Sequence, residues 1–202
     1  MIVLNSILAG TAIAIGGTVY LITGYAWLFP IGLFIVCFYN LDLFTGRICY
    51  ISGKDSIFKY PVIYLFNTVS AYLSGKVIAF CKPDLIEKAM ILTQAKLNEN
   101  LRIIPLAILC NVCIFVAVDS YKRTNGNPLG LIFATTVFVA CGFEHCIANS
   151  FYFGLAGELS KLSILFLITN AAWNALGGMW TKHLFYLGES RWPKTEENNL
   201  KK

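Results

Sequence analysis

Six long apolar runs are the feature that most constrains the fold of this chain. They cover residues 3–23, 25–53, 60–81, 103–119, 128–155 and 162–187. A membrane-spanning helix needs about 20 predominantly apolar residues, and each run approaches or exceeds that length. Of the 202 residues, 57% are hydrophobic and only 13% are charged, whereas about a quarter of the residues in soluble domains are charged. We therefore predict an integral membrane protein, which excludes a soluble globule, a disordered chain and a nucleic-acid binder.

The second and the fifth run are interrupted by polar residues. The segment 42–47 (D-L-F-T-G-R) interrupts the second run, and 142–145 (G-F-E-H) interrupts the fifth. Irregular backbone at membrane depth is tolerated only where it is buried in protein or lines an aqueous cavity. We therefore predict that both helices are broken. The residues expected to have structural roles at these breaks are Asp42, Gly46, Gly142 and Glu144.

The two interruptions occupy corresponding positions in two halves of the chain. Asp42 lies 102 residues before Glu144, and the Asn67/Gly75 spacing in the third run recurs as Asn170/Gly178 in the sixth. Three spans per half is an odd number, so the second half must be inverted relative to the first. Paired interruptions of this kind indicate an inverted repeat with a central site.

These observations predict one fold class and one domain. The fold is an all-α integral membrane protein with six transmembrane helices in two inverted three-helix repeats, the second and fifth helices being broken. The whole chain, 1–202, is expected to form a single transmembrane domain. Its repeats cover about 1–81 and 100–188, and a polar tail covers 189–202.

The positive charges favour one orientation in the membrane. An even number of spans places both termini on one side, and ten of the 16 Lys and Arg residues would lie on that side. An excess of positive charge is typical of the cytoplasmic side. We therefore predict a multi-pass protein of the cell membrane with both termini in the cytoplasm. The first apolar run has no preceding Lys or Arg and exceeds the length of a signal peptide, so it is interpreted as a retained span.

Three ionisable residues are predicted at membrane depth, namely Asp42, Glu144 and His145. An intramembrane charge costs about 2.5–3.5 kcal/mol on insertion scales, so such residues are functional candidates. For the two carboxylates we favour a structural role, in which they accept hydrogen bonds from backbone N–H groups freed by the breaks. For His145 we favour a functional role, because its break has a counterpart in the other half. Asn111, Asn170 and Asn174 are either interhelical hydrogen-bonding residues or pore-lining residues.

The sequence contains little that points to an enzyme. It has no cluster of metal ligands, no nucleophile triad and no phosphate-binding glycine loop, so no metal or cofactor is expected. The spacing of Cys110 and Cys113 is that of a redox pair, but both lie in the middle of an apolar run. Buried free thiols are the preferred interpretation, and a membrane thiol oxidoreductase remains a less favoured alternative.

Four motifs resemble those of the formate/nitrite transporter family. The segment 142–149 (G-F-E-H-C-I-A-N) resembles the family signature G-x-E-H-x-I-A-N, and 42–47 resembles the family's E-L-F-T-G-N, with Asp for Glu and Arg for Asn. The segments 109–111 and 174–178 match motifs of the fourth and sixth spans. The resemblance covers nearly the whole chain in the expected order, and its signature around His145 is specific.

The resemblance implies an aquaporin-like pore in each protomer of a homopentamer. Members of the family pass small monovalent anions of weak acids, such as formate, nitrite, hydrosulfide and lactate. By position, His145 resembles the central pore histidine, accompanied by Thr45 and Asn174, while Lys96 and Asn111 match a polar pair in the external vestibule. The outer constriction would be formed by Phe29 and Phe138, and the inner one by Leu33, Leu43, Phe44 and Ile114.

The expected mechanism is entry of an anion followed by proton-linked passage of the neutral acid past His145. Lys96 would attract the anion, and desolvation would then raise its basicity. The main alternative is a channel for neutral solutes such as water or glycerol, although no Asn-Pro-Ala motif occurs in the sequence. The sequence does not distinguish between these anions, and it leaves open the direction of flux, the gating and the protonation state of His145.

Overall fold

The structure is a computed structural model that describes residues 1–51 and 57–189. These residues form α-helices and three short 3-10 helices, η1 (Ala26–Leu28), η2 (Pro83–Leu85) and η3 (Asn100–Arg102). The α-helices are α1 (Ile2–Thr23), α2 (Ile31–Phe38), α3 (Phe44–Ile48), α4 (Lys59–Cys81), α5 (Ile86–Leu97), α6 (Ile103–Arg123), α7 (Leu129–Ala140), α8 (Cys146–Ala156) and α9 (Lys161–Glu189). Apart from Glu189, the predicted polar tail lies outside the described residues.

The predicted pattern of spans is confirmed. Helices α1, α4, α6 and α9 are each long and apolar enough to cross a membrane. The second apolar run forms α2 and α3, and the fifth forms α7 and α8, so both runs are broken helices. An additional helix, α5, lies within the 82–102 connection, where no helix was predicted, and it packs against α8.

Both breaks consist of a turn followed by a short non-helical stretch that ends in an extended residue, and the first lies earlier than predicted. Residues 39–43 separate α2 from α3, and residues 141–145 separate α7 from α8. In the second break Gly142 has φ +68°, a conformation that favours glycine. Gly46, by contrast, lies inside α3, and a Cβ there would meet only Val118 at an ordinary 3.6 Å. The prediction that Gly46 is needed for the break is therefore wrong.

The two halves interlock rather than lying side by side. Helix α8 of the second half packs against α4 and α1 of the first, and α3 of the first half packs against α9 of the second. The contact between α4 and α8 depends on Gly75 and Gly154, because a Cβ on either would collide with backbone atoms of the facing helix. Close contact through small residues is a common mode of helix packing in membranes.

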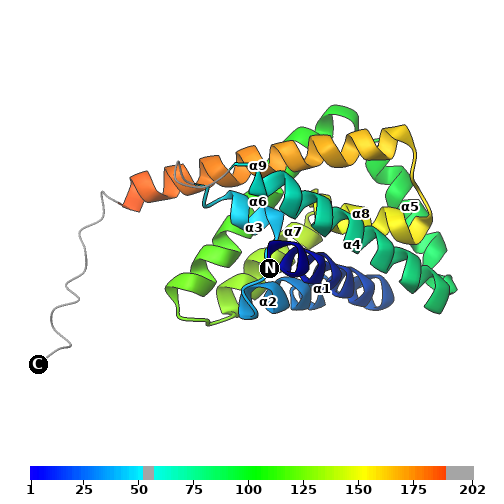
Figure 1. Ribbon diagram of the computed structural model, residues 1–202, viewed down its shortest axis with the longest axis horizontal. Coiled ribbons are helices and arrows are strands. Elements are labelled where there is room, and N and C mark those ends of the chain that lie inside the picture. Colours follow the sequence, from blue (N-terminus) through cyan, green and yellow to red (C-terminus); the bar gives the residue numbers. More distant parts are fainter. Residues whose placement is uncertain (52–56, 190–202) are drawn as a thin grey trace, which may run out of the picture.

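The long helices run roughly parallel to the long axis of the molecule (Figure 1). We call the end at which α1 begins, α9 ends and α6 turns into α7 the terminal side. The other end, which α5 covers, is the α5 side. Helix α9 has 29 residues and is about 44 Å long at 1.5 Å per residue, so it exceeds the roughly 30 Å hydrocarbon core of a bilayer.

Candidate functional site

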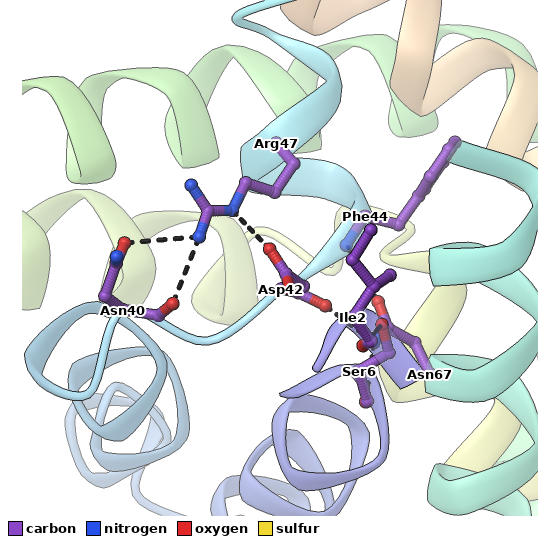
Figure 2. A network of polar contacts seen from close by, with 7 residues as sticks. All are labelled: Ile2, Ser6, Asn40, Asp42, Phe44, Arg47 and Asn67. Atoms are coloured by element: carbon purple, nitrogen blue, oxygen red, sulfur yellow. Dashed lines mark hydrogen bonds and ion pairs between the residues drawn. The ribbon is translucent and has the colours of Figure 1, made fainter. Parts of the chain in front are cut away.

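A buried asparagine on α4 holds the first break. The side-chain oxygen of Asn67 accepts a hydrogen bond from the N–H of Phe44 (2.7 Å), the first residue of α3. Its amide nitrogen donates to the carbonyls of Asp42 (2.9 Å) and Ser6 (2.7 Å). Figure 2 shows these groups converging between α1, α4 and the break. One neutral side chain thus pairs backbone donors and acceptors that no regular helix satisfies.

Asn174 on α9 makes the same set of bonds at the second break. Its side-chain oxygen accepts from the N–H of Cys146 (3.0 Å), and its nitrogen donates to the carbonyls of Glu144 (2.9 Å) and Ala107 (2.8 Å). The sequence spacing paired Asn67 with Asn170, but the hydrogen bonds make Asn174, one helical turn later, its structural counterpart. Asn170 adds a second donor to the Glu144 carbonyl at 2.9 Å.

The sequence had suggested that the two carboxylates accept hydrogen bonds from the freed backbone N–H groups. In the structure they do not, because the asparagines take that role. Each carboxylate pairs with a cation instead. The ammonium of Lys96 lies 2.7 Å from Glu144 Oε1, and their side chains are 13% and 1% exposed. The Nε of Arg47 lies 2.9 Å from Asp42 Oδ1, and the side chains of Arg47 and Asp42 are 36% and 14% exposed. An amide both donates and accepts without burying a charge, which makes asparagine the better partner for backbone groups.

His145 links the two breaks at the centre of the protein. As the N-cap residue of α8, its Nδ1 accepts a hydrogen bond from the N–H of Ala148 at 3.1 Å. Its Nε2 lies 2.9 Å from the hydroxyl oxygen of Thr45 on α3. Since Nδ1 acts as an acceptor, the neutral ring carries its proton on Nε2 and donates to Thr45. The proximity of His145 and Thr45, expected from the resemblance, is present in the structure.

A small cavity of about 80 Å³ borders His145 towards the α5 side. Phe29 and Phe138 both line it and contact each other edge to face, with ring centroids 5.5 Å apart. The ring of Phe138 also stacks on His145 at 5.7 Å. Lys96 lines the same cavity, so its positive charge faces the space next to His145. The pKa of the nearby Glu99 carboxyl group is raised, mainly by burial and to a smaller extent by the negative charge of Glu144.

A larger cavity of about 240 Å³ opens towards the terminal side. Leu33 and Leu43 line its inner part, and Leu43 is separated from Thr45 by a single residue. Leu33 lies in the first turn of α2, four residues after Phe29, which precedes that helix. The His145–Thr45 bridge is therefore flanked by aromatic side chains on one side and by aliphatic side chains on the other.

Five residues predicted to line the pathway are not among the residues that line either cavity: Thr45, Asn111, Asn174, Phe44 and Ile114. The amide of Asn111 donates to the carbonyl of Thr45 at 3.1 Å and does not line the cavity that contains Lys96. Phe44 packs against Tyr64 of α4, with ring centroids 5.2 Å apart. Ile114 is buried and lines neither cavity. Asn111 thus binds the backbone of α3, and its pairing with Lys96 in a vestibule stays a prediction.

The cysteine pair shows no geometry suited to redox exchange. Cys110 and Cys113 are both free, and Cys110 is completely buried. A dithiol that exchanges with a partner must be accessible, and this position in the middle of α6 prevents access. Within residues 1–51 and 57–189, no group of three or more His, Cys, Asp or Glu side chains is arranged to hold a metal ion.

Comparison with known proteins agrees with the geometry of the breaks. The family model described as formate/nitrite transporter matches residues 1–187. The chain belongs to the formate/nitrite transporter family. As a member of this family, it is a multi-pass membrane protein, and the resemblance inferred from its motifs is confirmed.

Curated relatives within the formate/nitrite transporter family are distant. The uncharacterized transporter YrhG of Bacillus subtilis is 28% identical over 144 residues, which are 62% of this chain and 54% of YrhG. The formate channel FocA of Haemophilus influenzae is 27% identical over 180 residues, 73% of this chain and 63% of FocA. The alignments thus span about half to two thirds of the relatives' length.

Solved structures of the formate/nitrite transporter family share the fold along nearly the whole chain. A pentameric formate channel with formate bound superposes with a TM-score of 0.75 at 22% identity, covering 93% of this chain and 94% of that one. An ion channel of the family superposes with a TM-score of 0.77 at 21% identity, covering 94% of this chain and 88% of that one. These likenesses confirm the predicted all-helical membrane fold.

Sequence reasoning missed the charged partners on the two sides of the site. The motif comparison noted Arg47 as a departure from the family pattern, and Lys122, which lines the terminal-side cavity, was counted only among the positive charges that indicate the orientation. Asp42 and Arg47 carry opposite charges only five residues apart in the sequence, which could have suggested their pairing. Asn149, which donates to the Glu144 carboxylate, lies within the quoted signature but was assigned no role.

Proposed function

We propose that this protein is a channel for small monovalent anions of weak acids, such as formate, nitrite and hydrosulfide, rather than an enzyme. The observation that carries the proposal is the His145–Thr45 hydrogen bond, placed between one cavity on the α5 side and another on the terminal side. A single polar contact between two apolar constrictions is a suitable place for a small solute to exchange hydrogen bonds while it is shielded from bulk water.

The apolar constrictions favour passage of the neutral acid over the anion. Moving an isolated carboxylate-sized ion into a low-dielectric region costs on the order of 20 kcal/mol in the idealised limit, whereas a neutral acid loses only a few hydrogen bonds. Desolvation also raises the basicity of the anion. An anion that enters between Phe29 and Phe138 would therefore take up a proton and cross as the acid.

His145 is suited to donate a hydrogen bond to the permeating species. Its Nε2–H, now directed at Thr45, can donate to an oxygen or sulfur atom of a solute that displaces the Thr45 hydroxyl, while Nδ1 remains bound to Ala148. A charged ring would have to give up the Ala148 bond, because both ring nitrogens would then be donors. This supports a neutral His145 and a proton supplied by water.

Lys96 supports attraction of anions from the α5 side, although its charge is not isolated. One ammonium proton binds Glu144, and the remaining protons can reach an anion in the adjoining cavity. The pair with Glu144 makes the local field weaker than that of a lone lysine, so Lys96 would act at short range through hydrogen bonding rather than by long-range steering.

The proposal includes a homopentamer in the cell membrane with both termini in the cytoplasm. The solved relative with formate bound is a pentamer, and its likeness in fold supports a similar assembly here. The excess of Lys and Arg on the terminal side supports the orientation. Residues 1–202 would then form a single channel domain, with repeats at about 1–81 and 100–188.

Flux measurements on the purified protein in proteoliposomes test this function. We expect formate and nitrite uptake that rises as the external pH falls from 7 to 5, because the fraction of neutral acid increases, and no swelling in glycerol. The Cys110→Ser, Cys113→Ser double variant serves as a control and should retain this uptake. Glycerol swelling without formate uptake would instead identify a neutral-solute channel, and loss of uptake in the double variant would implicate the thiols.

A further inference from the structure

The terminal-side cavity is lined by two positive charges. Among the residues around this space of about 240 Å³, Arg47 and Lys122 are charged, and none of the lining residues is acidic. Arg47 comes from α3, next to the first break, and Lys122 comes from the last turn of α6. The ammonium of Lys122 lies 3.6 Å from the ring centroid of Tyr50, which restricts its position by a cation–π contact.

The guanidinium of Arg47 is only partly occupied by protein groups. Its Nε pairs with Asp42, and Nη2 donates to the carbonyl (3.0 Å) and to the side-chain oxygen (3.2 Å) of Asn40. In Figure 2 the remaining nitrogen, Nη1, points away from both partners. Within the described part of the chain, Nη1 makes no hydrogen bond. The side chain is therefore held in one orientation and still has two N–H donors available.

We propose that Arg47 and Lys122 form an anion-binding site in the terminal-side cavity, and that Asp42 sets its affinity by partly neutralising Arg47. The inference rests on the proposed function, and it adds a second binding step on the side opposite Lys96. The arrangement repeats that of the α5 side, where a break carboxylate, Glu144, pairs with the cation that lines the cavity.

The geometry of Arg47 favours a particular class of anion. Two oxygen atoms on one carbon or nitrogen atom can accept from the free Nη1 of Arg47 and from the ammonium of Lys122 at the same time. Formate and nitrite have this shape, whereas hydrosulfide offers a single sulfur atom. The site is therefore expected to bind small planar anions with two oxygen atoms in preference to hydrosulfide, and this preference should weaken when the Arg47 donor is removed.

A purely structural role for Arg47 leads to a different result. If Arg47 served only to bind Asp42 and Asn40, removal of either partner of the ion pair would disturb the break in the same way, and Arg47→Gln and Asp42→Asn would change transport in the same direction. If Asp42 competes with the permeating anion for Arg47, the two substitutions have opposite effects on half-saturation.

The test measures formate and hydrosulfide flux from each side in proteoliposomes of one orientation, established by protease access to a C-terminal tag. For entry from the terminal side, Arg47→Gln should raise the half-saturating formate concentration about three- to tenfold, and Asp42→Asn should lower it about two- to threefold. Arg47→Gln should also impair formate more than hydrosulfide. Lys182→Gln, on the same side but outside the cavity lining, is the matched control and should change half-saturation less than twofold.

Two outcomes would overturn the inference. The first is a shift of half-saturation in the same direction for Arg47→Gln and Asp42→Asn. The second is an equal change for entry from both sides, because a local binding site affects entry from its own side. In either case the wild-type protein would still carry formate, whereas failure of the proposed function itself would be seen as absence of formate flux in the wild type.

Discussion

Replacing Glu144 with glutamine is expected to lower the free energy of unfolding by about 3 kcal/mol, because removing one partner of a buried ion pair leaves the other charge uncompensated. Glu144 is almost fully buried, Lys96 is nearly so, and their nitrogen and oxygen atoms are 2.7 Å apart. The same substitution weakens the bond from Asn149 to the carboxylate. Thermal unfolding of the detergent-solubilised protein measures the effect as a lower Tm.

Asp42→Asn is the matched control for this prediction. Asp42 occupies the corresponding position at the first break, but its partner Arg47 is more than one-third exposed. Ion pairs that are open to solvent contribute about 0–1 kcal/mol, so this variant should unfold close to the wild-type temperature. Equal destabilisation by Glu144→Gln and Asp42→Asn would mean that burial does not set the strength of the two pairs, and it would contradict the account of the breaks.

Replacing His145 with asparagine should reduce formate flux about ten- to hundredfold while leaving the fold intact. Asparagine is a favourable N-cap residue, so its side-chain oxygen can accept the bond that Ala148 now donates to Nδ1. It is too short to replace the imidazole at Thr45, and loss of one buried hydrogen bond to the solute corresponds to about 1–3 kcal/mol. Flux into proteoliposomes, together with Tm, separates transport from stability.

Thr45→Val provides the complementary variant. Valine has nearly the shape of threonine and removes only the hydroxyl that accepts from His145, so the Nε2–H loses its resting partner. Flux should change less than in His145→Asn, because the donor that serves the solute is retained. Full formate flux in His145→Asn, at an unchanged Tm, would contradict the central role of the imidazole.

Apolar runs and their interruptions were sufficient to predict the spans and the two broken helices, whereas the family followed from the resemblance of four motifs. These features depend on the length of the hydrocarbon core and on the cost of irregular backbone within it, so they can be recognised from the sequence alone. The proximity of Thr45 and His145, which lie 100 residues apart, followed from the resemblance to family motifs. No short-range pattern would have brought them together.

The partners of the polar side chains could not be predicted in the same way. Asn67 and Asn174 make equivalent hydrogen bonds, but they lie at different distances along the sequence from the breaks that they hold. The segments that form α4 and α9 are therefore offset from each other in the alignment of the two halves. Asn111 was assigned to the α5-side vestibule from its position in the chain, whereas the packing of α6 directs it at the carbonyl of Thr45. The pairing of Lys96 with Glu144 depends on α5, a helix with too few apolar residues to appear as a span.

The most direct test of the central claim is the number of protons that accompany each formate ion. A pH-sensitive dye trapped in proteoliposomes and labelled formate are followed together while the membrane potential is varied. Passage as the neutral acid predicts one proton for each formate and a flux that does not depend on the potential. A formate current that follows the potential, without a matching change in internal pH, would contradict proton-linked passage past His145.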